Sequence, residues 1–344
     1  MLPRDVGRPS LTSLAGNPSQ PSQHQIEAHG QPVSDGGPHA RAQAVHTWYG
    51  DAPLNPQAET FDTKWAEQVG NWFPNKHTYP QGLRPLGDAL RDLELGFVLW
   101  FEPERVHPGT LLEREHPEWL LRPLGDTEYL FNLGHPEARR FMTDKVSALI
   151  AEAGVTCYRQ DFNMHPALNW DGADAPDRVG MSEIRHIEGL YAFWDELLAR
   201  HPGLMIDCCA SGGTRIDLET ISRSMFLWRS DVQCLPDLSP TAMQTQTHGL
   251  SLWVPTSAGC CRSPETYGFR SALGPGIVLD WSTRAYEMKV GFPDKLPLAR
   301  QLLDEQIALR PYFRVETPGF PASKPGLLPA KRLPGRKPGF WPHS

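Results

Sequence analysis

The chain has 344 residues, 40% of them hydrophobic, and can bury one large or two medium-sized cores. Its formal net charge of −7 argues against a general nucleic-acid or membrane-surface binder, and no apolar run approaches the ~18 residues of a membrane-spanning helix. The N-terminus lacks the apolar stretch of a signal peptide, and the six cysteines include no CxxC spacing typical of zinc sites. These features indicate a reduced, cytoplasmic protein without a cysteine-built metal site.

The two ends of the chain differ in composition from its middle. Residues 1–45 are rich in Pro, Ser, Gln, Gly and His and show no sustained periodicity, which predicts a disordered N-terminal segment. Residues 314–344 combine recurring prolines with Lys and Arg, and no acidic residue follows Glu316. This composition predicts an unstructured, solvated tail rather than a nucleic-acid-binding arm. The folded domain is therefore expected over residues 46–313.

Within 46–313, short apolar strands alternate with amphipathic helices. The expected strands are 97–103, 155–161, 204–210, 226–231, 252–257 and 275–280. Two apolar stripes at helical spacing, within residues 142–153 and 184–198, lie between them. Alternating strands and helices predict βαβ units and a parallel sheet.

Two parallel-sheet folds fit this alternation. A doubly wound nucleotide fold requires a glycine-rich turn after an early strand, and neither GxGxxG nor GxxxxGK[ST] occurs. A barrel instead gathers polar residues at the carboxyl ends of many strands. Four expected strands end in this way, in Glu102 and Glu104, in Asp161 and Asn163, in Cys209 and Ser211, and in Asp231. The pattern favours a barrel in which these residues line one pocket.

Asp161 and Asp231 form a candidate carboxylate pair. Cleavage of a glycosidic bond needs a proton donor and a group that stabilises an oxocarbenium-like centre, and retaining enzymes use two carboxyl groups about 5–5.5 Å apart. Arg159 lies two residues before Asp161, so strand alternation places both on one face, and its charge would keep Asp161 ionised. Asp231 would need a raised pKa to act as an acid. The competing interpretation is that each aspartate caps a helix or forms a turn.

Several ordered blocks support the carboxylate pair. The chain contains Gly70-Asn71-Trp72, the run LWFEPE at 99–104, Tyr158-Arg159-Gln160-Asp161-Phe162-Asn163, Cys209-Ala210-Ser211-Gly212-Gly213 and Trp228-Arg229-Ser230-Asp231. In order and spacing these blocks resemble glycoside hydrolase family 36, the bacterial α-galactosidases, over roughly residues 48–313.

The resemblance implies a (β/α)8 TIM-barrel catalytic domain that removes terminal α-linked galactose from oligosaccharides by retaining double displacement, without cofactor or metal. It makes Asp161 the nucleophile and Asp231 the acid/base. Arg159, at the family's lysine position, would bind a sugar hydroxyl. The other implied substrate-binding residues are Trp72, Asn163, Cys209, Ser211 and Gly212. Glu102 would orient its neighbours, and the resemblance leaves an oligomer open.

The chain also departs from the family pattern. Only strands 3–8 of the barrel are recognisable, and residues 1–45 show no strand pattern that could supply the first two. An open barrel would leave edge strands unpaired, which predicts marginal stability. The family's acidic residue before the Trp-Gly turn is missing at Val45-His46-Thr47-Trp48. The family's flanking β-sandwich domains have no counterpart.

These departures suggest family sequence truncated at both ends, as a truncated or frame-shifted gene would give. The alternatives to an active α-galactosidase are a catalytically inactive remnant and a same-fold α-N-acetylgalactosaminidase or galactosyl transferase.

Overall fold

The computed structural model describes residues 26–30, 42–45, 47–51, 65–122, 128–235, 238–279 and 292–313. The predicted disorder of 1–45 and 314–344 falls outside these ranges, apart from 26–30 and 42–45. No helix in the described ranges is both long and apolar enough to cross a lipid bilayer.

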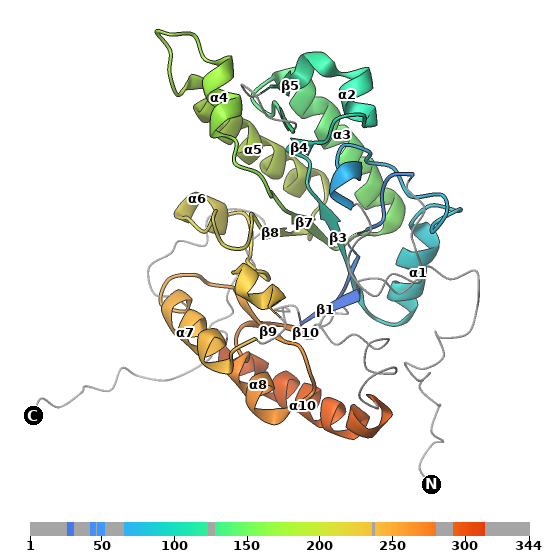
Figure 1. Ribbon diagram of the computed structural model, residues 1–344. Helices are drawn as coiled ribbons and strands as arrows, with labels where there is room; N and C mark the ends of the chain where they lie inside the picture. Colours follow the sequence, from blue (N-terminus) through green and yellow to red (C-terminus); the bar gives the residue numbers. More distant parts are fainter. Residues whose placement is uncertain are drawn as a thin grey trace, which may run out of the picture.

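The centre of the molecule is a seven-stranded sheet (Figure 1). Its spatial order is β8 (Met205–Cys208), β7 (Cys157–Gln160), β3 (Gly96–Phe101), β2 (Ala42–Val45), β1 (Ile26–Gly30), β10 (Gly276–Leu279) and β9 (Ala258–Cys261). Every neighbouring pair is parallel except the two that involve β1, which runs antiparallel to β2 and β10. The expected α/β fold with a parallel sheet is confirmed.

Residues 225 and 226 join the two ends of this sheet. Parallel bridges pair Asp207 of β8 with Met225, and Phe226 with Ser257, the residue before β9. The amide of Met225 donates to the carbonyl of Ile206 at 2.9 Å, and the amide of Ala258 donates to that of Phe226 at 3.0 Å. Within the described residues, the seven strands and this short segment therefore form a closed ring.

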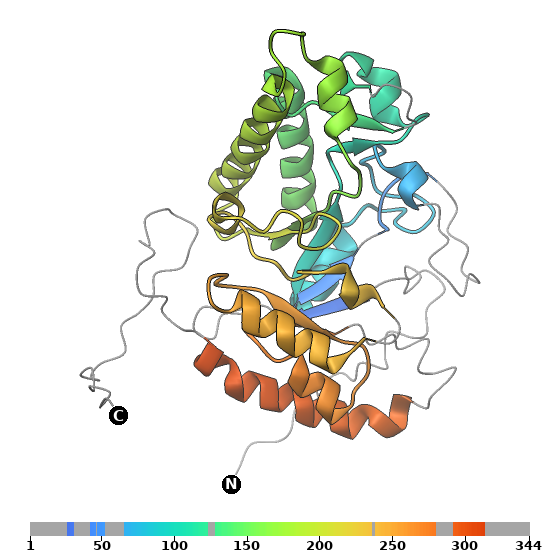
Figure 2. The same cartoon turned by 60° about the vertical axis from the view of Figure 1, so that its left-hand side comes forward.

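The N-terminal part of the ring was not expected. The prediction that residues 1–45 contain no strand is wrong at β1 and β2, which lie between β3 and β10 (Figure 2). Ala42 and Ala44 of β2 are buried with Val98 and Cys157. Alanine has a weak strand propensity, so packing against neighbouring strands decides the structure here. The predicted unpaired edge of β3 is absent, because β3 pairs with β2 and β7.

Two predicted strands are displaced or reduced. Residues 226–231 contribute only the bridge at Phe226 before the 3-10 helix η4 (Asp231–Cys234) begins. The strand predicted at 252–257 lies instead at 258–261, because Pro255 cannot donate to a ladder whereas the small residues of β9 fit a fully buried position. The strands expected at 97–103, 155–161, 204–210 and 275–280 are present as β3, β7, β8 and β10.

Helices cover the outside of the ring. Helix α3 (Pro136–Ala153) buries the predicted stripe Met142, Val146, Leu149, Ile150 and Ala153. It begins with Pro136 after a His135 cap and ends at Gly154, whose φ is +71°. Helix α5 (Met181–Arg200) buries Leu190, Trp194 and Leu197. The prediction for Ile184 is wrong, because this side chain is 51% exposed.

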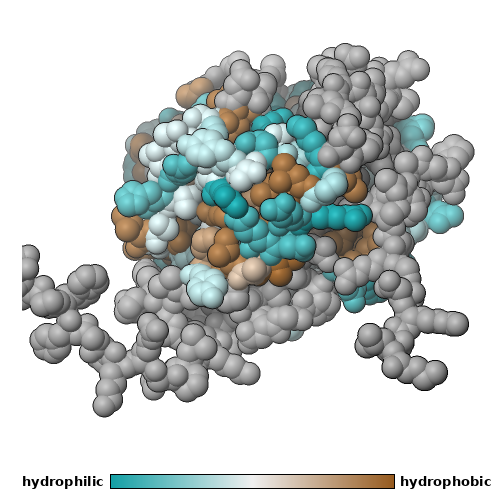
Figure 3. All heavy atoms as spheres, turned by 90° about the horizontal axis from the view of Figure 1, so that it is seen from below, coloured by the Kyte–Doolittle hydropathy of each residue, from teal (hydrophilic) through white to brown (hydrophobic). Residues whose placement is uncertain are grey.

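The remaining elements complete the shell. They are α1 (Arg84–Asp92), α2 (Leu111–Glu115), α4 (Ala167–Ala173), α6 (Leu218–Ile221), α7 (Pro240–Leu250), α8 (Thr266–Ser271), α10 (Phe292–Phe313), η2 (Trp65–Gln68), η3 (Pro117–Trp119) and a small sheet of β4 (Arg105–Val106), β6 (Tyr129–Phe131) and β5 (Leu120–Leu121). Seen from below, on the α10 side, hydrophilic side chains are interspersed with hydrophobic ones (Figure 3).

Candidate active site

Asp161 lies directly after β7, where its amide still donates to the carbonyl of Phe101 at 2.8 Å. The side chain is 9% exposed. Its Oδ1 accepts from the Phe162 amide at 2.8 Å, and its Oδ2 accepts from Nε1 of Trp100 at 3.2 Å. The end of the strand thus holds this carboxylate in a fixed orientation.

The environment of Asp161 favours its ionised form. Burial alone would raise the pKa of this carboxyl group. The charge of Arg159 and hydrogen bonds from the Asn163 side chain, the Phe162 backbone and the Cys209 side chain outweigh burial, so the pKa lies below its ordinary value. A carboxylate that stays ionised is suited to act as a nucleophile.

Arg159 is fixed by a second carboxylate. Its Nη1 donates to Oδ2 of Asp207 at 2.6 Å, and its guanidinium lies 5.5 Å from the centroid of the Trp228 ring. Oδ1 of Asp207 accepts from the Leu227 amide at 2.8 Å. Asp207 therefore connects β7, β8 and the segment that closes the ring. Sequence reasoning missed this residue, although an acidic side chain inside an apolar strand is an available signal.

Asp231 is the first residue of η4, whose N-terminus is capped by Ser230. Its carboxyl group is less buried than that of Asp161, and its pKa is raised. Burial is the largest cause, followed by the negative charge of Asp161, whereas a hydrogen bond from Trp228 and the charge of Arg159 lower it. The two aspartates are close enough to influence each other, and their pKa values move in opposite directions.

The segment Cys209–Gly213, called the glycine loop below, packs against the backbone of the Asp231 segment. Gly212 has φ +77°, and a Cβ atom there would lie 2.7 Å from the Asp231 amide nitrogen. A Cβ atom on Gly213 would lie 2.4 Å from the carbonyl oxygen of Arg229. Only glycine permits both the left-handed backbone and this close approach. The loop therefore sets how the end of β8 meets the start of η4.

The predicted pocket residues of this loop are brought to the aspartates. Cys209 is buried, and its thiol donates a hydrogen bond to Asp161. Burial and the charge of Asp161 raise the pKa of this thiol, so it stays protonated. Ser211 is exposed, with φ +42°, and its Oγ donates to the carbonyl of Phe162 at 3.4 Å. Gly212 contacts the other aspartate through its backbone.

Glu102 directly follows β3 and is fully buried. It accepts from Nε and Nη2 of Arg105 at 2.9 and 2.6 Å and from the backbone amide of Asn163. Burial and the charge of Asp161 raise its pKa to about 7 despite the arginine. The contact with the Asn163 amide gives Glu102 a direct influence on the segment that follows Asp161.

An aromatic cluster borders the carboxylates. Trp72 packs against Tyr49 and Trp100, with ring centroids 4.8 and 6.3 Å apart. Trp72 is 2% exposed, and its Nε1 finds no hydrogen-bond partner within the described part of the chain. Trp100, which donates to Asp161, was not predicted from the sequence, because an apolar residue inside a strand normally only fills the core. The backbone carbonyl of Trp100 accepts from Nε1 of Trp48 at 2.7 Å.

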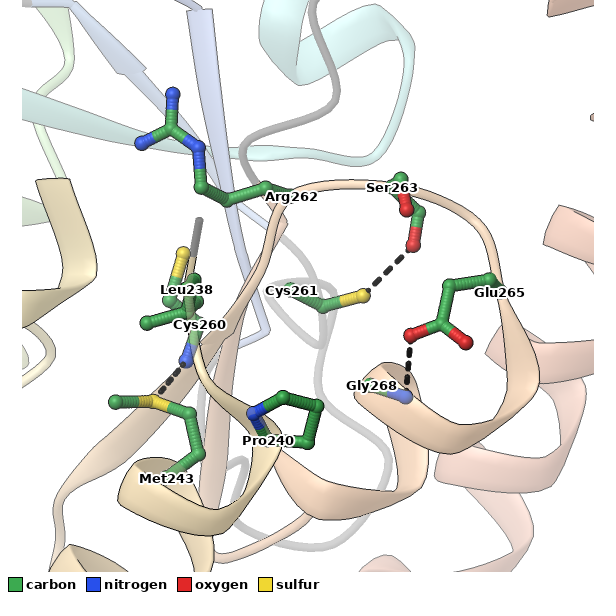
Figure 4. Close-up of a pocket in the computed structure, with 9 residues that line it drawn as sticks. All are labelled: Leu238, Pro240, Met243, Cys260, Cys261, Arg262, Ser263, Glu265 and Gly268. Atoms are coloured by element: carbon green, nitrogen blue, oxygen red, sulfur yellow. Dashed lines mark hydrogen bonds between the residues drawn. The ribbon is translucent and has the colours of Figure 1, made fainter. Parts of the chain in front are cut away.

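A small cavity of about 160 Å³ lies between the starts of α7 and α8 and the end of β9 (Figure 4). Its walls are Leu238, Pro240, Met243, Cys260, Cys261, Arg262, Ser263, Glu265 and Gly268. Nη1 of Arg262 donates to the carbonyl of Gln233 at 3.2 Å, which connects this cavity to η4. Neither Asp161 nor Asp231 lines it. Across the described ranges, no group of three or more His, Cys, Asp or Glu side chains could hold a metal ion.

Comparison with known proteins identifies similar sequences. The family model named Melibiase matches residues 59–262. Alpha-galactosidase AgaA of Geobacillus stearothermophilus is 30% identical over 169 residues, covering 47% of this chain and 23% of AgaA. An alpha-galactosidase of Escherichia coli is 32% identical over 170 residues, with the same coverage of 47% and 23%. The chain thus spans about a quarter of the length of these relatives.

Solved structures show the same fold. An alpha-galactosidase of Lactobacillus brevis superposes with a TM-score of 0.65 at 19% identity, covering 79% of this chain and 36% of that one. A variant of AgaA from Geobacillus stearothermophilus in complex with stachyose gives a TM-score of 0.63 at 22% identity, covering 78% and 37%. At this level of identity the likeness concerns the fold.

Proposed function

Because this chain belongs to the melibiase family and is similar to the α-galactosidases of glycoside hydrolase family 36, we propose that it cleaves terminal α-linked galactose from oligosaccharides by retaining double displacement. The observation that carries the proposal is the opposite shift in the pKa values of Asp161 and Asp231. Two carboxyl groups whose pKa values are shifted in opposite directions are suited to divide the roles of nucleophile and acid/base.

In the first step, Asp161 attacks the anomeric carbon of the galactose. The bond from this carbon to the glycosidic oxygen breaks, and Asp231 gives its proton to that oxygen, so the leaving group departs as a neutral alcohol. The product on the enzyme is a galactosyl ester of Asp161. The lowered pKa of Asp161 and the raised pKa of Asp231 both favour the starting protonation states.

In the second step, Asp231 acts as a base. It takes a proton from a water molecule while the water oxygen attacks the anomeric carbon, and the ester bond to Asp161 breaks. Two inversions give net retention, so galactose leaves as the α anomer. Beyond the galactoside and one water molecule, the two steps need no further reactant.

Other side chains would hold the sugar. Trp72 would donate its indole N–H to a galactose hydroxyl, which is supported by the buried Nε1 that has no partner among the described residues. Arg159 would hold Asp161 ionised and direct N–H groups at a hydroxyl, while Asn163, Ser211 and the protonated Cys209 thiol would shape the pocket. The stachyose complex of the related AgaA variant supports an α-galactoside oligosaccharide as substrate.

The direct test is hydrolysis of p-nitrophenyl α-galactoside by the purified chain. We expect turnover by the unaltered chain, release of α-galactose as the first anomer by NMR, and a loss of roughly 10³-fold or more in Asp161→Asn and Asp231→Asn. Asp144→Asn is the matched control, because this exposed aspartate pairs with Arg200 on the surface. Equal turnover by Asp161→Asn, or no turnover by the folded unaltered chain, would refute the proposal.

A further inference from the structure

Three side chains from different parts of the fold converge on Glu104, which is fully buried. Arg215 binds it through two parallel hydrogen bonds, Nη1 to Oε1 at 2.7 Å and Nη2 to Oε2 at 2.8 Å. Nε2 of Gln160 donates to Oε1 at 2.7 Å, and Nε2 of His186 lies 2.8 Å from Oε2. Glu104 is therefore saturated with partners and has little freedom to move.

Each partner of Glu104 belongs to a segment that carries part of the site. Gln160 directly precedes Asp161, and its Oε1 accepts from Nε1 of Trp194 at 2.7 Å, which fixes the amide. Arg215 follows the glycine loop by two residues. The guanidinium of Arg215 also lies 4.3 Å from the centroid of the Phe162 ring, directly after the nucleophile. Glu104 thus connects the segment of Asp161 to the glycine loop.

The glycine loop transmits this connection to the acid/base. The site of a Cβ on Gly212 is 2.7 Å from the Asp231 amide nitrogen and 2.9 Å from Cα of Ser230. The loop is itself braced, because the Ala210 amide donates to the Gly212 carbonyl at 2.9 Å. A shift of Arg215 would therefore move backbone atoms that press on the start of η4.

The Glu104–Arg215 pair is ionic at any pH at which the enzyme could work. Burial alone would raise the pKa of Glu104, but the charge of Arg215 and the contact with His186 outweigh it and lower the pKa to about 2. A bidentate arginine–carboxylate pair defines both distance and orientation, which a single hydrogen bond does not.

We propose that the Glu104–Arg215 pair is a positioning device, which holds the glycine loop against η4 and so aims the Asp231 carboxyl group at the leaving oxygen. This inference rests on the proposed function. Because the glycine loop packs directly on the Asp231 backbone, we expect Arg215 to act mainly on proton donation. The loss caused by breaking the pair should therefore depend on how much the leaving group needs a proton.

The test compares Arg215→Gln with the unaltered chain on aryl and alkyl α-galactosides whose leaving groups differ in acidity. The parameter is kcat/KM, which reports on the first, proton-donating step. We expect a loss of roughly 10²-fold with methyl α-galactoside and less than about 3-fold with 2,4-dinitrophenyl α-galactoside, whose leaving group departs without protonation. Arg215→Lys, which keeps the cation but not the two parallel bonds, should recover part of the loss.

Arg223→Gln is the matched control, because Arg223 makes a similar pair with Asp195, Nε to Oδ1 at 2.9 Å, on the outside of the fold. It should leave the dependence on leaving group unchanged. Should Arg215→Gln fail to fold, Glu104→Gln, of nearly the same size, takes its place. A loss that is equal for all leaving groups, or no loss in a folded variant, would overturn the inference. Inactivity of the unaltered chain would instead refute the proposed function.

Discussion

Asp161 and Asp231 show how two identical side chains acquire different properties from their neighbours. Asp161 is more buried, yet the charge of Arg159 and three hydrogen-bond donors lower its pKa below the ordinary value. Burial and the charge of Asp161 raise the pKa of Asp231 above its ordinary value, and the hydrogen bond from Trp228 and the charge of Arg159 only partly oppose them. Activity should therefore fall at low pH as Asp161 is protonated and at high pH as Asp231 loses its proton.

Trp228→Phe should shift one limb of this pH profile. The hydrogen bond from Trp228 lowers the pKa of Asp231, so its removal raises that pKa further and moves the basic limb of kcat/KM to higher pH. The shift would assign the basic limb to Asp231 rather than to Glu102, since the Trp228 bond is to Asp231. Trp119→Phe, in η3, is the control and should leave the profile unchanged. A basic limb that stays in place or moves to lower pH would contradict the assignment.

Trp100→Phe should loosen the orientation of the Asp161 carboxylate while preserving the aromatic cluster. The variant loses the donor that lies 3.2 Å from Oδ2 of Asp161. This donor fixes the orientation of the carboxylate, and a misoriented reacting group should lower kcat/KM by roughly 10-fold. Steady-state kinetics on p-nitrophenyl α-galactoside measure this loss in kcat/KM. Activity within about 2-fold of the unaltered chain would show that Trp100 only fills space.

At the scale of single elements, the glycine loop offers a matched pair of substitutions. Gly212→Ala places a methyl group 2.7 Å from the Asp231 amide nitrogen at φ +77°, so we expect a loss of about 1–3 kcal/mol in stability and at least roughly 10-fold in activity. Gly154→Ala has nearly the same φ, +71°, but nothing within 4 Å of the new methyl group. It should lose stability, by about 1 kcal/mol, without losing activity. Thermal melts and kinetics on both variants measure this, and an active Gly212→Ala would contradict the contact.

Helices and strands whose apolar residues recur at regular spacing could be predicted from the sequence. Strands that depend on pairing with distant segments could not. The stripe of α3 and the strand β3 are apolar at regular spacing, so burial follows directly from the pattern. Strand β2 reads AQAV and is defined only by its neighbours β1 and β3. Asp161 follows the end of β7 as the pattern predicts, whereas Asp231 begins η4 rather than ending a strand. Asp207 and Trp100 act through contacts with residues 20 to 61 positions away, which spacing does not reveal.

At the scale of the whole molecule, closure of the ring is the main difference from the expectation. The sequence suggested an open barrel lacking its first two strands, whereas β1 and β2 connect β3 to β10. The strand β1 runs antiparallel to both neighbours, so the ring departs from an all-parallel barrel at this point. Closure leaves the long edges of β3 and β10 paired, which removes sites for association between chains.

Removal of residues 1–45 tests the contribution of these two strands. The shortened chain should expose the edges of β3 and β10 and the apolar side chains beneath them, which lowers the melting temperature and promotes aggregation. Differential scanning calorimetry and light scattering against the full chain measure both effects. A shortened chain that melts at the same temperature and stays monodisperse would show that the ring does not depend on β1 and β2.

The central claim is that Asp161 forms a covalent bond with the sugar while Asp231 serves as acid and base. It is tested most directly by trapping the intermediate with a fluorinated galactosyl fluoride, followed by peptide mapping by mass spectrometry. The account predicts one galactosyl adduct per chain, attached to the peptide that contains Asp161. An adduct on Asp231 or on another residue, or turnover that releases β-galactose without any adduct, would contradict it.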